Sequence, residues 1–214
     1  MKKILLITFI AAFALSSCEK DTLGVSTVTT YPTIQLKGDV AQTILVGGTY
    51  TESGVVALEG TTDISSSVKI TGTVDAATAG VYTLTYTATN KDGFTISARR
   101  YVGVVTAAAA AQDISGVYKR NAGAGGLATI VKYKTYAGLY VNNNPGGIAI
   151  ITGTNEIYIY MFQTDVAKVS APAQDSSVGE FACTNGSYNA TAKSYSWVCI
   201  NSGYGTSART FIKQ

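Results

Sequence analysis

The stretch VYTLTYTA, residues 81–88, decides the fold class of the chain around it. Tyr82, Leu84, Tyr86 and Ala88 alternate with threonines. Successive side chains of a strand point to opposite faces, so this alternation predicts a strand with one face in a hydrophobic core. Such strands, repeated and separated by turns, are typical of a β-sandwich.

The sequence on both sides of this stretch continues the pattern. Short alternating segments occur at residues 33–38, 41–47, 68–72 and 94–105, and the turn Asn90-Lys91-Asp92-Gly93 separates the last two strands. The spacing in AGVYTLTY also resembles a tyrosine corner, with Leu84 at the place of the second cysteine of antibody domains. These features predict an immunoglobulin-like sandwich over residues 31–106.

Four segments strengthen this interpretation: PTIQLKGD, VGGTYTESGVVA, VDAATAGVYTLTYTATNKDGF and RRYVGVV. Together they resemble the immunoglobulin-like domain of bacterial surface proteins and pesticidal crystal toxins. The resemblance implies a spacer or interaction domain without catalytic residues.

The N-terminus has the order of parts of a secretory signal peptide. Lys2 and Lys3 precede an apolar run over residues 4–15, which is too short to span a bilayer. The quartet Leu15-Ser16-Ser17-Cys18 resembles a bacterial lipobox, in which the cysteine receives lipid and becomes the new N-terminus. We therefore expect a signal peptide over residues 1–17, a lipid anchor on Cys18 and a polar tether over residues 18–30.

The charged residues behind the cysteine point to a location. Glu19, Lys20 and Asp21 resemble the surface-export signal of Bacteroidota lipoproteins, and Asp21-Thr22-Leu23 resembles the O-glycosylation acceptor of Bacteroides-type exported proteins. The resemblance implies a protein anchored in the outer membrane and facing the cell exterior.

A second domain follows a run of five alanines. The run is shorter than the roughly 12 residues of a stable isolated helix, so residues 107–112 are interpreted as a linker. Residues 113–214 are predicted to form a second β-sandwich or a small β-barrel, which makes the whole chain all-β. The strand candidates lie around Tyr118 and at residues 128–133, 139–142, 148–152, 156–162, 179–184, 195–200 and 209–212.

Two cysteines remain once Cys18 carries lipid. If residues 179–188 and 194–202 pair antiparallel, Cys183 and Cys199 lie directly opposite each other, and a disulfide bond is favoured. The alternative uses Asn185-Gly186 as a tight turn and places the cysteines two strands apart, which is too far for a bond.

The composition argues against catalysis, metal binding and nucleic-acid binding. The sequence has no histidine, and loss of Lys2 and Lys3 leaves 14 basic against 13 acidic residues. The loop NAGAGG lacks the Gly-Lys-Ser/Thr of a phosphate-binding loop. We expect no enzyme activity, no cofactor and no metal. The carboxylates of the second domain, interpreted as solvated surface, are Asp113, Glu156, Asp165, Asp175 and Glu180.

Aromatic residues provide the best candidates for a binding site. Nine of the 14 tyrosines and the single tryptophan, Trp197, lie beyond residue 112. In EIYIYMF, residues 156–162, the alternation places apolar aliphatic side chains on one face and aromatic ones on the other. The aromatic face is either covered by a neighbour or offers a ligand platform. The candidate ligand-binding residues are Tyr158, Tyr160, Phe162, Tyr133, Tyr136, Tyr140 and Tyr204.

Segments of the second domain carry a further resemblance. SGVYKR, YAGLYVNN and GSYN…SYSWVCINSGYG resemble the C-terminal domain of small accessory lipoproteins encoded with Sus-type nutrient importers. The resemblance implies binding of a glycan or peptide, or docking on SusC-like and SusD-like proteins. An adhesin-like or structural surface module unrelated to uptake is the alternative.

The lipid anchor is directly testable. Replacing Cys18 with Ala removes the only thiol of the lipobox-like quartet, so the protein should leave the membrane fraction. Fractionation followed by immunoblotting measures this, with Cys183→Ala as the control that keeps its anchor. A Cys18→Ala protein that stays membrane-bound would contradict the prediction.

Overall fold

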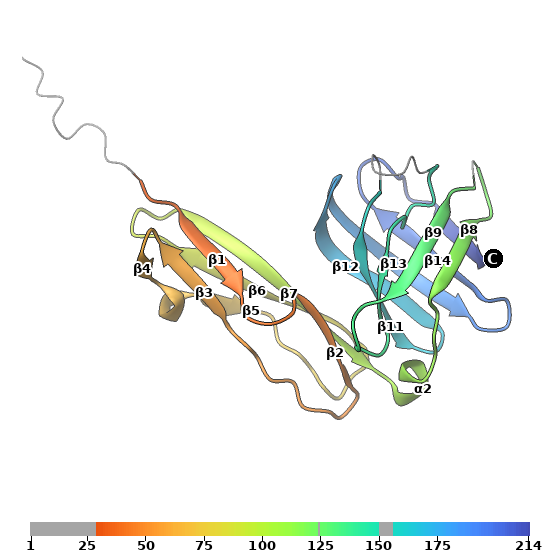
Figure 1. Ribbon diagram of the computed structural model, residues 1–214, viewed down its shortest axis with the longest axis horizontal. Coiled ribbons are helices and arrows are strands. Elements are labelled where there is room, and N and C mark those ends of the chain that lie inside the picture. The colour runs from red at the N-terminus through yellow and green to blue at the C-terminus, as the bar shows by residue number, and fades with distance from the viewer. Residues whose placement is uncertain (1–28, 124, 150–155) are drawn as a thin grey trace, which may run out of the picture. The chain divides into compact units, whose positions relative to one another are not determined.

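The structure, a computed structural model, describes residues 29–123, 125–149 and 156–214, of which Tyr31–Gln214 form one compact unit. It is all-β: an immunoglobulin-like sandwich is followed by an eight-stranded closed barrel (Figure 1). The predicted fold class is confirmed, with the barrel, not a second sandwich, as the C-terminal domain. The predicted signal peptide, Cys18 and nearly all of the tether lie outside the described residues.

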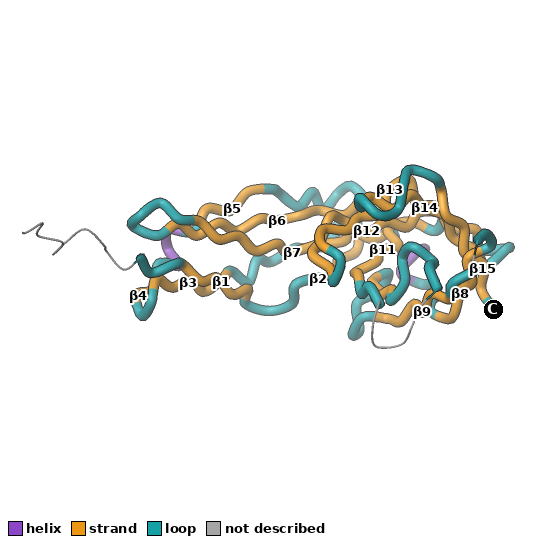
Figure 2. Tube along the Cα trace, turned by 90° about the horizontal axis from the view of Figure 1, so that it is seen from above, coloured by secondary structure: helices purple, strands orange, loops and turns teal. Residues whose placement is uncertain are grey.

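The sandwich consists of two sheets, which Figure 2 shows as two layers. One sheet has the order β1 (Pro32–Leu36), β3 (Val55–Glu59) and β4 (Thr62–Asp63). The other has the order β2 (Ala41–Leu45), β7 (Thr95–Val105), β6 (Gly80–Thr89) and β5 (Lys69–Thr71). β2 runs parallel to β7, and the remaining pairs are antiparallel. A 3-10 turn, η1 (Ser65–Ser67), precedes β5.

β6 behaves as its alternation predicts. Leu84, Tyr86 and Ala88 are buried, and the threonines between them are half-buried. The hydroxyl of Tyr82 donates to the carbonyl of Thr78 at 2.8 Å, which is the hydrogen bond of a tyrosine corner. The predicted turn after β6 is also present, closed by a hydrogen bond from Gly93 N to the Asn90 carbonyl, 3.1 Å long, with φ of +87° at Gly93.

A buried arginine lies in the sandwich core. Arg100 is fully buried, and its guanidinium donates to a carboxylate oxygen of Glu52 at 2.8 Å and lies 5.7 Å from the centre of the Tyr86 ring. A second guanidinium nitrogen donates to the carbonyl of Lys37. The charge is thus paired, as burial of an ion requires. The sequence pattern of β7 gave no sign of this pair.

The barrel is closed by antiparallel pairing of β15 with β8. Its strands are β8 (Gly116–Arg120), β9 (Leu127–Lys132), β10 (Leu139–Asn142), β11 (Ile159–Asp165), β12 (Lys168–Ser176), β13 (Gly179–Asn189), β14 (Ser194–Ile200) and β15 (Ala208–Lys213). Closure leaves these strands without a free edge.

Two strand predictions for the barrel differ from the structure. Residues 148–149 of the candidate strand 148–152 are not in a strand, and 150–152 lie outside the described residues. β12 was not predicted, because KVSAPAQDS contains Pro172 and several residues of low β propensity. The register of β12 against β13 shifts on both sides of Ala171, and such bulges are where a sheet accepts proline.

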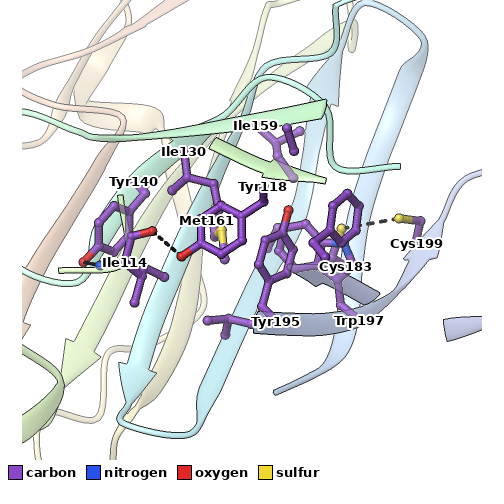
Figure 3. Packing of buried hydrophobic residues seen from close by; sticks show 14 of the residues in the cluster. Ile114, Tyr118, Ile130, Tyr140, Ile159, Met161, Cys183, Tyr195, Trp197 and Cys199 are labelled. Atoms are coloured by element: carbon purple, nitrogen blue, oxygen red, sulfur yellow. Dashed lines mark hydrogen bonds between the residues drawn. The ribbon is translucent and has the colours of Figure 1, made fainter. Parts of the chain in front are cut away.

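The barrel interior is filled with aromatic side chains (Figure 3). Tyr195 stacks on Phe211 with ring centres 4.6 Å apart, and it meets Trp197 edge to face at 5.0 Å. The Trp197 indole donates to the carbonyl of Pro145 at 2.9 Å. The interior is therefore a packed core, as expected of a small barrel.

The cysteines have the predicted register, but no disulfide bond joins them in the structure. Cys183 on β13 lies directly opposite Cys199 on β14, and Asn185, with φ of +52°, sits in a bulge instead of a hairpin turn. Both are free thiols, with the sulfur atoms 3.9 Å apart where a bond needs about 2.05 Å (Figure 3). Cys199 instead donates to the carbonyl of Pro145 at 3.3 Å. Burial raises the pKa of Cys183, which favours the thiol.

Where the sandwich meets the barrel, the alanine run forms one helical turn, α2 (Ala107–Ala110), in place of the expected linker. The side chain of Thr106 accepts a hydrogen bond from the Ala109 backbone at 3.2 Å and so caps the turn. The backbone of Thr106 also donates to the carbonyl of Thr164 on β11, at 3.0 Å. α2 packs against β11, so the connection is tied to the barrel.

Phe162 on β11 fills the junction between sandwich and barrel. It is fully buried with Ala41, Tyr101 and Leu139. A Cβ added at Gly103 of β7 would lie 2.6 Å from the Phe162 ring, so only glycine leaves room for it. Thr43 of β2 adds a hydrogen bond to the carbonyl of Ala137, 2.8 Å long. The two parts thus share a buried cluster at the junction, between the core of the sandwich and the core of the barrel.

The disulfide bond remains a prediction for the exported protein, because the cell exterior is oxidising. Oxidation of Cys183 and Cys199 should stabilise the protein by about 3 kcal/mol, since it closes a short loop of the unfolded chain. Thermal unfolding with and without reductant measures this stabilisation. The substitution Cys183→Ala should remove the difference in stability between the two conditions. Peptide mapping of native material that finds two free thiols would contradict the prediction.

Candidate functional site

β11 and residues 156–158 before it present two apolar faces, and the structure covers them differently. Residues 156–158 of the predicted strand 156–162 are not in a strand, since β11 begins at Ile159. Ile157, Ile159 and Met161 are buried in the barrel core, as the alternation predicts. On the outer face, Tyr158 is 57% exposed and Tyr160 is half-buried. The outer face therefore emerges from the junction, at Phe162, toward solvent, at Tyr158.

A groove runs over this outer face, and we call it the aromatic groove. Its central hollow, about 210 Å³, is lined by Tyr133, Val141, Tyr158, Ile159, Tyr160, Gln174 and Asp175. A hollow of about 250 Å³ adjoins it, shares Val141 and Tyr158, and adds Thr129, Val131 and Asn143. On the other side a hollow of about 150 Å³ shares Tyr160, Gln174 and Asp175. Because they share lining residues, the three hollows lie next to one another, and together they make up the groove.

The tyrosine rings of the groove are held in fixed orientations. Tyr133 meets Tyr160 edge to face with ring centres 5.1 Å apart, and Tyr101 lies 6.4 Å from Tyr160. Burial, with a further contribution from the neighbouring Tyr133, raises the pKa of Tyr160 to about 12.

The exposed ring of Tyr158 is anchored by its own hydroxyl. This hydroxyl donates to a carboxylate oxygen of Glu156 at 2.9 Å, and the hydrogen bond raises the pKa of Tyr158. The ring face stays available in the groove while its polar tip is satisfied. Such a rigid, amphipathic surface suits stacking against a ligand.

Gln174 lines the groove, and its side-chain amide replaces backbone hydrogen bonds between β11 and β12. The register shift beside Gln174 is in the pairing of β12 with β13. The pairing of β12 with β11 extends only to Phe162 and Ser170, and beyond this pair the Gln174 amide bonds to the backbone of Tyr160. The amide oxygen accepts from the backbone N–H of Tyr160 at 2.7 Å, and the amide nitrogen donates to the Tyr160 carbonyl at 3.0 Å. Gln174 is therefore a positioning residue for Tyr160.

The segment after β9 fastens the groove to the sandwich. Tyr136 donates through its hydroxyl to a carboxylate oxygen of Asp39 at 2.8 Å, and Lys134 forms an ion pair with the same carboxylate. The hydrogen bonds from Lys134 and Tyr136 lower the pKa of Asp39. This contact fixes Tyr133, whose ring stacks 6.4 Å from that of Tyr136.

The structure brings together only some of the predicted ligand-binding residues. Tyr133, Tyr158 and Tyr160 line the groove. Phe162 and Tyr140 are fully buried, so their assignment as ligand contacts is corrected: Phe162 packs in the junction and Tyr140 in the barrel core.

Two further candidates take structural roles. Tyr136 holds Asp39, and Tyr204 packs edge to face on Phe181 at 5.1 Å and under the Arg209 guanidinium, among the residues next to the barrel core. The groove residues missed from the sequence are Val40, Arg99, Tyr101, Gln174 and Val141. Arg99, Tyr101 and Val141 were expected only as strand residues, and Val40 and Gln174 lay outside the expected strands, so no signal pointed to a site.

The carboxylates of the barrel are dispersed. Asp113 accepts from Ser115 and pairs with Lys132, and these contacts lower its pKa to about 2, with Ser115 dominant. Glu180 pairs with Arg99 at 2.6 Å. Asp165 lies on β11 and Asp175 on β12. Over residues 29–123, 125–149 and 156–214, no three His, Cys, Asp or Glu side chains are placed to hold a metal ion. In the same part of the chain, no helix has the length and hydropathy to cross a bilayer.

Comparisons with known proteins bear on the sandwich. Residues 34–104 match the family model of the bacterial surface protein Ig-like domain, which confirms the resemblance seen in the sequence. The protein is thus a cell-surface module with an immunoglobulin-like domain. No curated protein matches the chain in sequence.

Two solved structures align with the chain. A lipoprotein from Bacteroides thetaiotaomicron aligns over 86% of this chain and 100% of its own, with 24% identity and a TM-score of 0.39. The M60 catalytic domain with two CBM51 domains from Clostridium perfringens ZmpB aligns over 56% of this chain and 15% of its own, with 19% identity and a TM-score of 0.32.

The role of Gln174 gives a stability prediction. Gln174→Ala leaves the Tyr160 backbone N–H and carbonyl without partners, so the free energy of unfolding should fall by about 1–3 kcal/mol. Urea unfolding measures this. Asp175→Ala, a change at the exposed neighbour, should alter the value by no more than about 0.5 kcal/mol. Equal effects of the two substitutions on the free energy of unfolding would contradict the role of Gln174 in positioning Tyr160.

Proposed function

We propose that the protein is a non-catalytic outer-membrane lipoprotein that assists a Sus-type nutrient importer by binding ligand in the aromatic groove or by docking on the importer's SusC-like and SusD-like components. The observation that carries the proposal is the groove itself. Tyr133, Tyr158 and Tyr160 line a hollow on the outer barrel face, where their rings are fixed by Gln174, Glu156 and the junction. Concave sites lined by aromatic rings and a few polar groups are typical of ligand binding.

The chemistry of the groove supports binding without catalysis. The sequence offers no histidine as a general base, and Glu156 is engaged by the Tyr158 hydroxyl. Hydrolysis of a glycosidic bond needs two carboxylates on opposite sides of the bond. In the central hollow the only lining carboxylate is Asp175. The groove therefore suits retention of a ligand at the surface.

The lipobox-like quartet at Cys18 supports the anchored location, and the segments of the second domain that resemble accessory lipoproteins support the link to uptake. The match of residues 34–104 to an immunoglobulin-like surface domain favours a second candidate, an adhesin-like or structural module. Genes for a SusC-like and SusD-like pair next to this gene would separate the first candidate from the second.

The binding proposal can be tested by electrophoresis of the chain without its predicted signal peptide. The gels contain starch, xylan, mannan or laminarin, and tryptic peptides of casein are titrated separately. We expect retardation in at least one polysaccharide or saturable peptide binding, weakened at least tenfold by Tyr158→Ala. Tyr31→Ala, which removes a ring 64% exposed on the sandwich, is the control and should have no effect. Binding that survives Tyr158→Ala in a folded protein would contradict the proposal.

A further inference from the structure

The aromatic groove continues beyond the barrel onto the sandwich. Its third hollow is lined by Val40, Arg99 and Tyr101 together with Tyr160, Gln174 and Asp175 of the barrel. Arg99 and Tyr101 belong to β7, and Val40 immediately precedes β2. One wall of this end of the groove is therefore built by the immunoglobulin-like domain, which the sequence had predicted to be a spacer or interaction domain.

This wall is fixed in place by contacts on both sides of the groove. Arg99 donates to Glu180 at 2.6 Å and to the carbonyl of Ala173 at 3.3 Å, and both partners belong to the barrel. On the buried side Phe162 packs against Gly103. The sandwich residues are thus held beside Tyr160 without requiring a ligand to order them, which lowers the cost of binding.

The charges around the groove indicate what it accepts. Arg99 is neutralised by Glu180, and Lys134 is neutralised by Asp39. Asp175, an exposed carboxylate, remains at the rim and disfavours an anionic ligand. A carboxylate accepts hydrogen bonds from hydroxyl groups, and tyrosine faces pack against apolar surface. These properties match a neutral chain that carries many hydroxyl groups.

The closed barrel favours an oligosaccharide over a peptide. Peptides commonly bind by adding a strand to a free sheet edge. The strands that line the barrel part of the groove, β9 to β12, each have a neighbour on both sides within the closed barrel. At Tyr160, where the pairing of β11 with β12 has ended, the Gln174 amide occupies the backbone N–H and carbonyl, so that mode is blocked there. An oligosaccharide needs no backbone ladder and can be held by rings and side-chain acceptors alone.

We infer that the aromatic groove binds a neutral oligosaccharide across the junction, with Val40, Arg99 and Tyr101 of the immunoglobulin-like domain forming its terminal subsite. The inference rests on the proposed binding function and names its ligand class and a second contributing domain. The immunoglobulin-like domain then sets how long a chain the groove accepts.

The test places a bulky side chain at the sandwich end without altering the barrel. Val40 is 38% exposed, so Val40→Trp should fold normally and fill the third hollow. Leu45→Trp is the matched control, because Leu45 is 50% exposed on the same domain and lines a different hollow. The readout is retardation of the chain in gels of starch, xylan, mannan or laminarin, with heparin and casein peptides as anionic and peptide probes. Thermal unfolding checks each variant.

We expect retardation in at least one neutral polysaccharide, weakened at least tenfold by Val40→Trp and unchanged by Leu45→Trp. Binding that is abolished by Tyr158→Ala but unaffected by Val40→Trp would overturn the shared site and leave the proposed function standing. Binding only to heparin or to the peptides would overturn the ligand class. Absence of binding to every probe would overturn both the inference and the ligand-binding arm of the proposed function.

Discussion

The packing of Phe162 against Gly103 is the constraint on which the arrangement of the binding surface depends. A fully buried phenylalanine on the outer face of a barrel strand needs a partner that covers it, and β7 of the sandwich provides one because it has no side chain at residue 103. Burial of an aromatic ring contributes several kilocalories per mole, comparable to a sizeable part of a domain's net stability. The barrel and the sandwich therefore share the buried cluster around Phe162, and an isolated barrel would expose it.

The groove follows from this junction and from a bulged strand. The register of β12 against β13 shifts on both sides of Ala171, and the pairing of β12 with β11 ends at Phe162 and Ser170. Beyond that pair, the Gln174 amide bonds to the backbone N–H and carbonyl of Tyr160. Bulges often lie beside functional sites because they redirect side chains and open the ladder. Here the bulged strand leaves a hollow beside Tyr160, while the sandwich closes the adjoining end. The result is a site on rigid elements, with Arg99 and Lys134 in ion pairs and Asp175 exposed at the rim.

The sequence predicted the parts of the fold that depend on local periodicity. The alternation in β6 identified the sandwich and its tyrosine corner, and the spacing of Cys183 and Cys199 identified the β13–β14 register. It did not predict β12, whose proline and alanines obscure the period of two, nor barrel closure between β15 and β8, which is a pairing of distant segments. The helical turn α2 forms because Thr106 caps it and β11 supports it, which no propensity of five alanines reveals.

The residues of the candidate site were less predictable from the sequence than the strands of the fold. The period of β11 correctly separated Ile157, Ile159 and Met161 from the aromatic face. It did not distinguish Tyr158, which is open, from Phe162, which is covered, because the covering residues lie about 60 positions earlier in the chain. Likewise, the sequence identifies Arg99 and Tyr101 only as ordinary strand residues. Their place beside Tyr160 depends on tertiary packing.

The central claim is that sandwich and barrel act as one unit, so that both contribute to a single groove. Differential scanning calorimetry of the chain without its predicted signal peptide tests this directly. Two-state unfolding gives a calorimetric enthalpy equal to the van't Hoff enthalpy. We expect one transition, with a ratio of calorimetric to van't Hoff enthalpy of about 1. Two separate transitions, each with its own enthalpy, would contradict it.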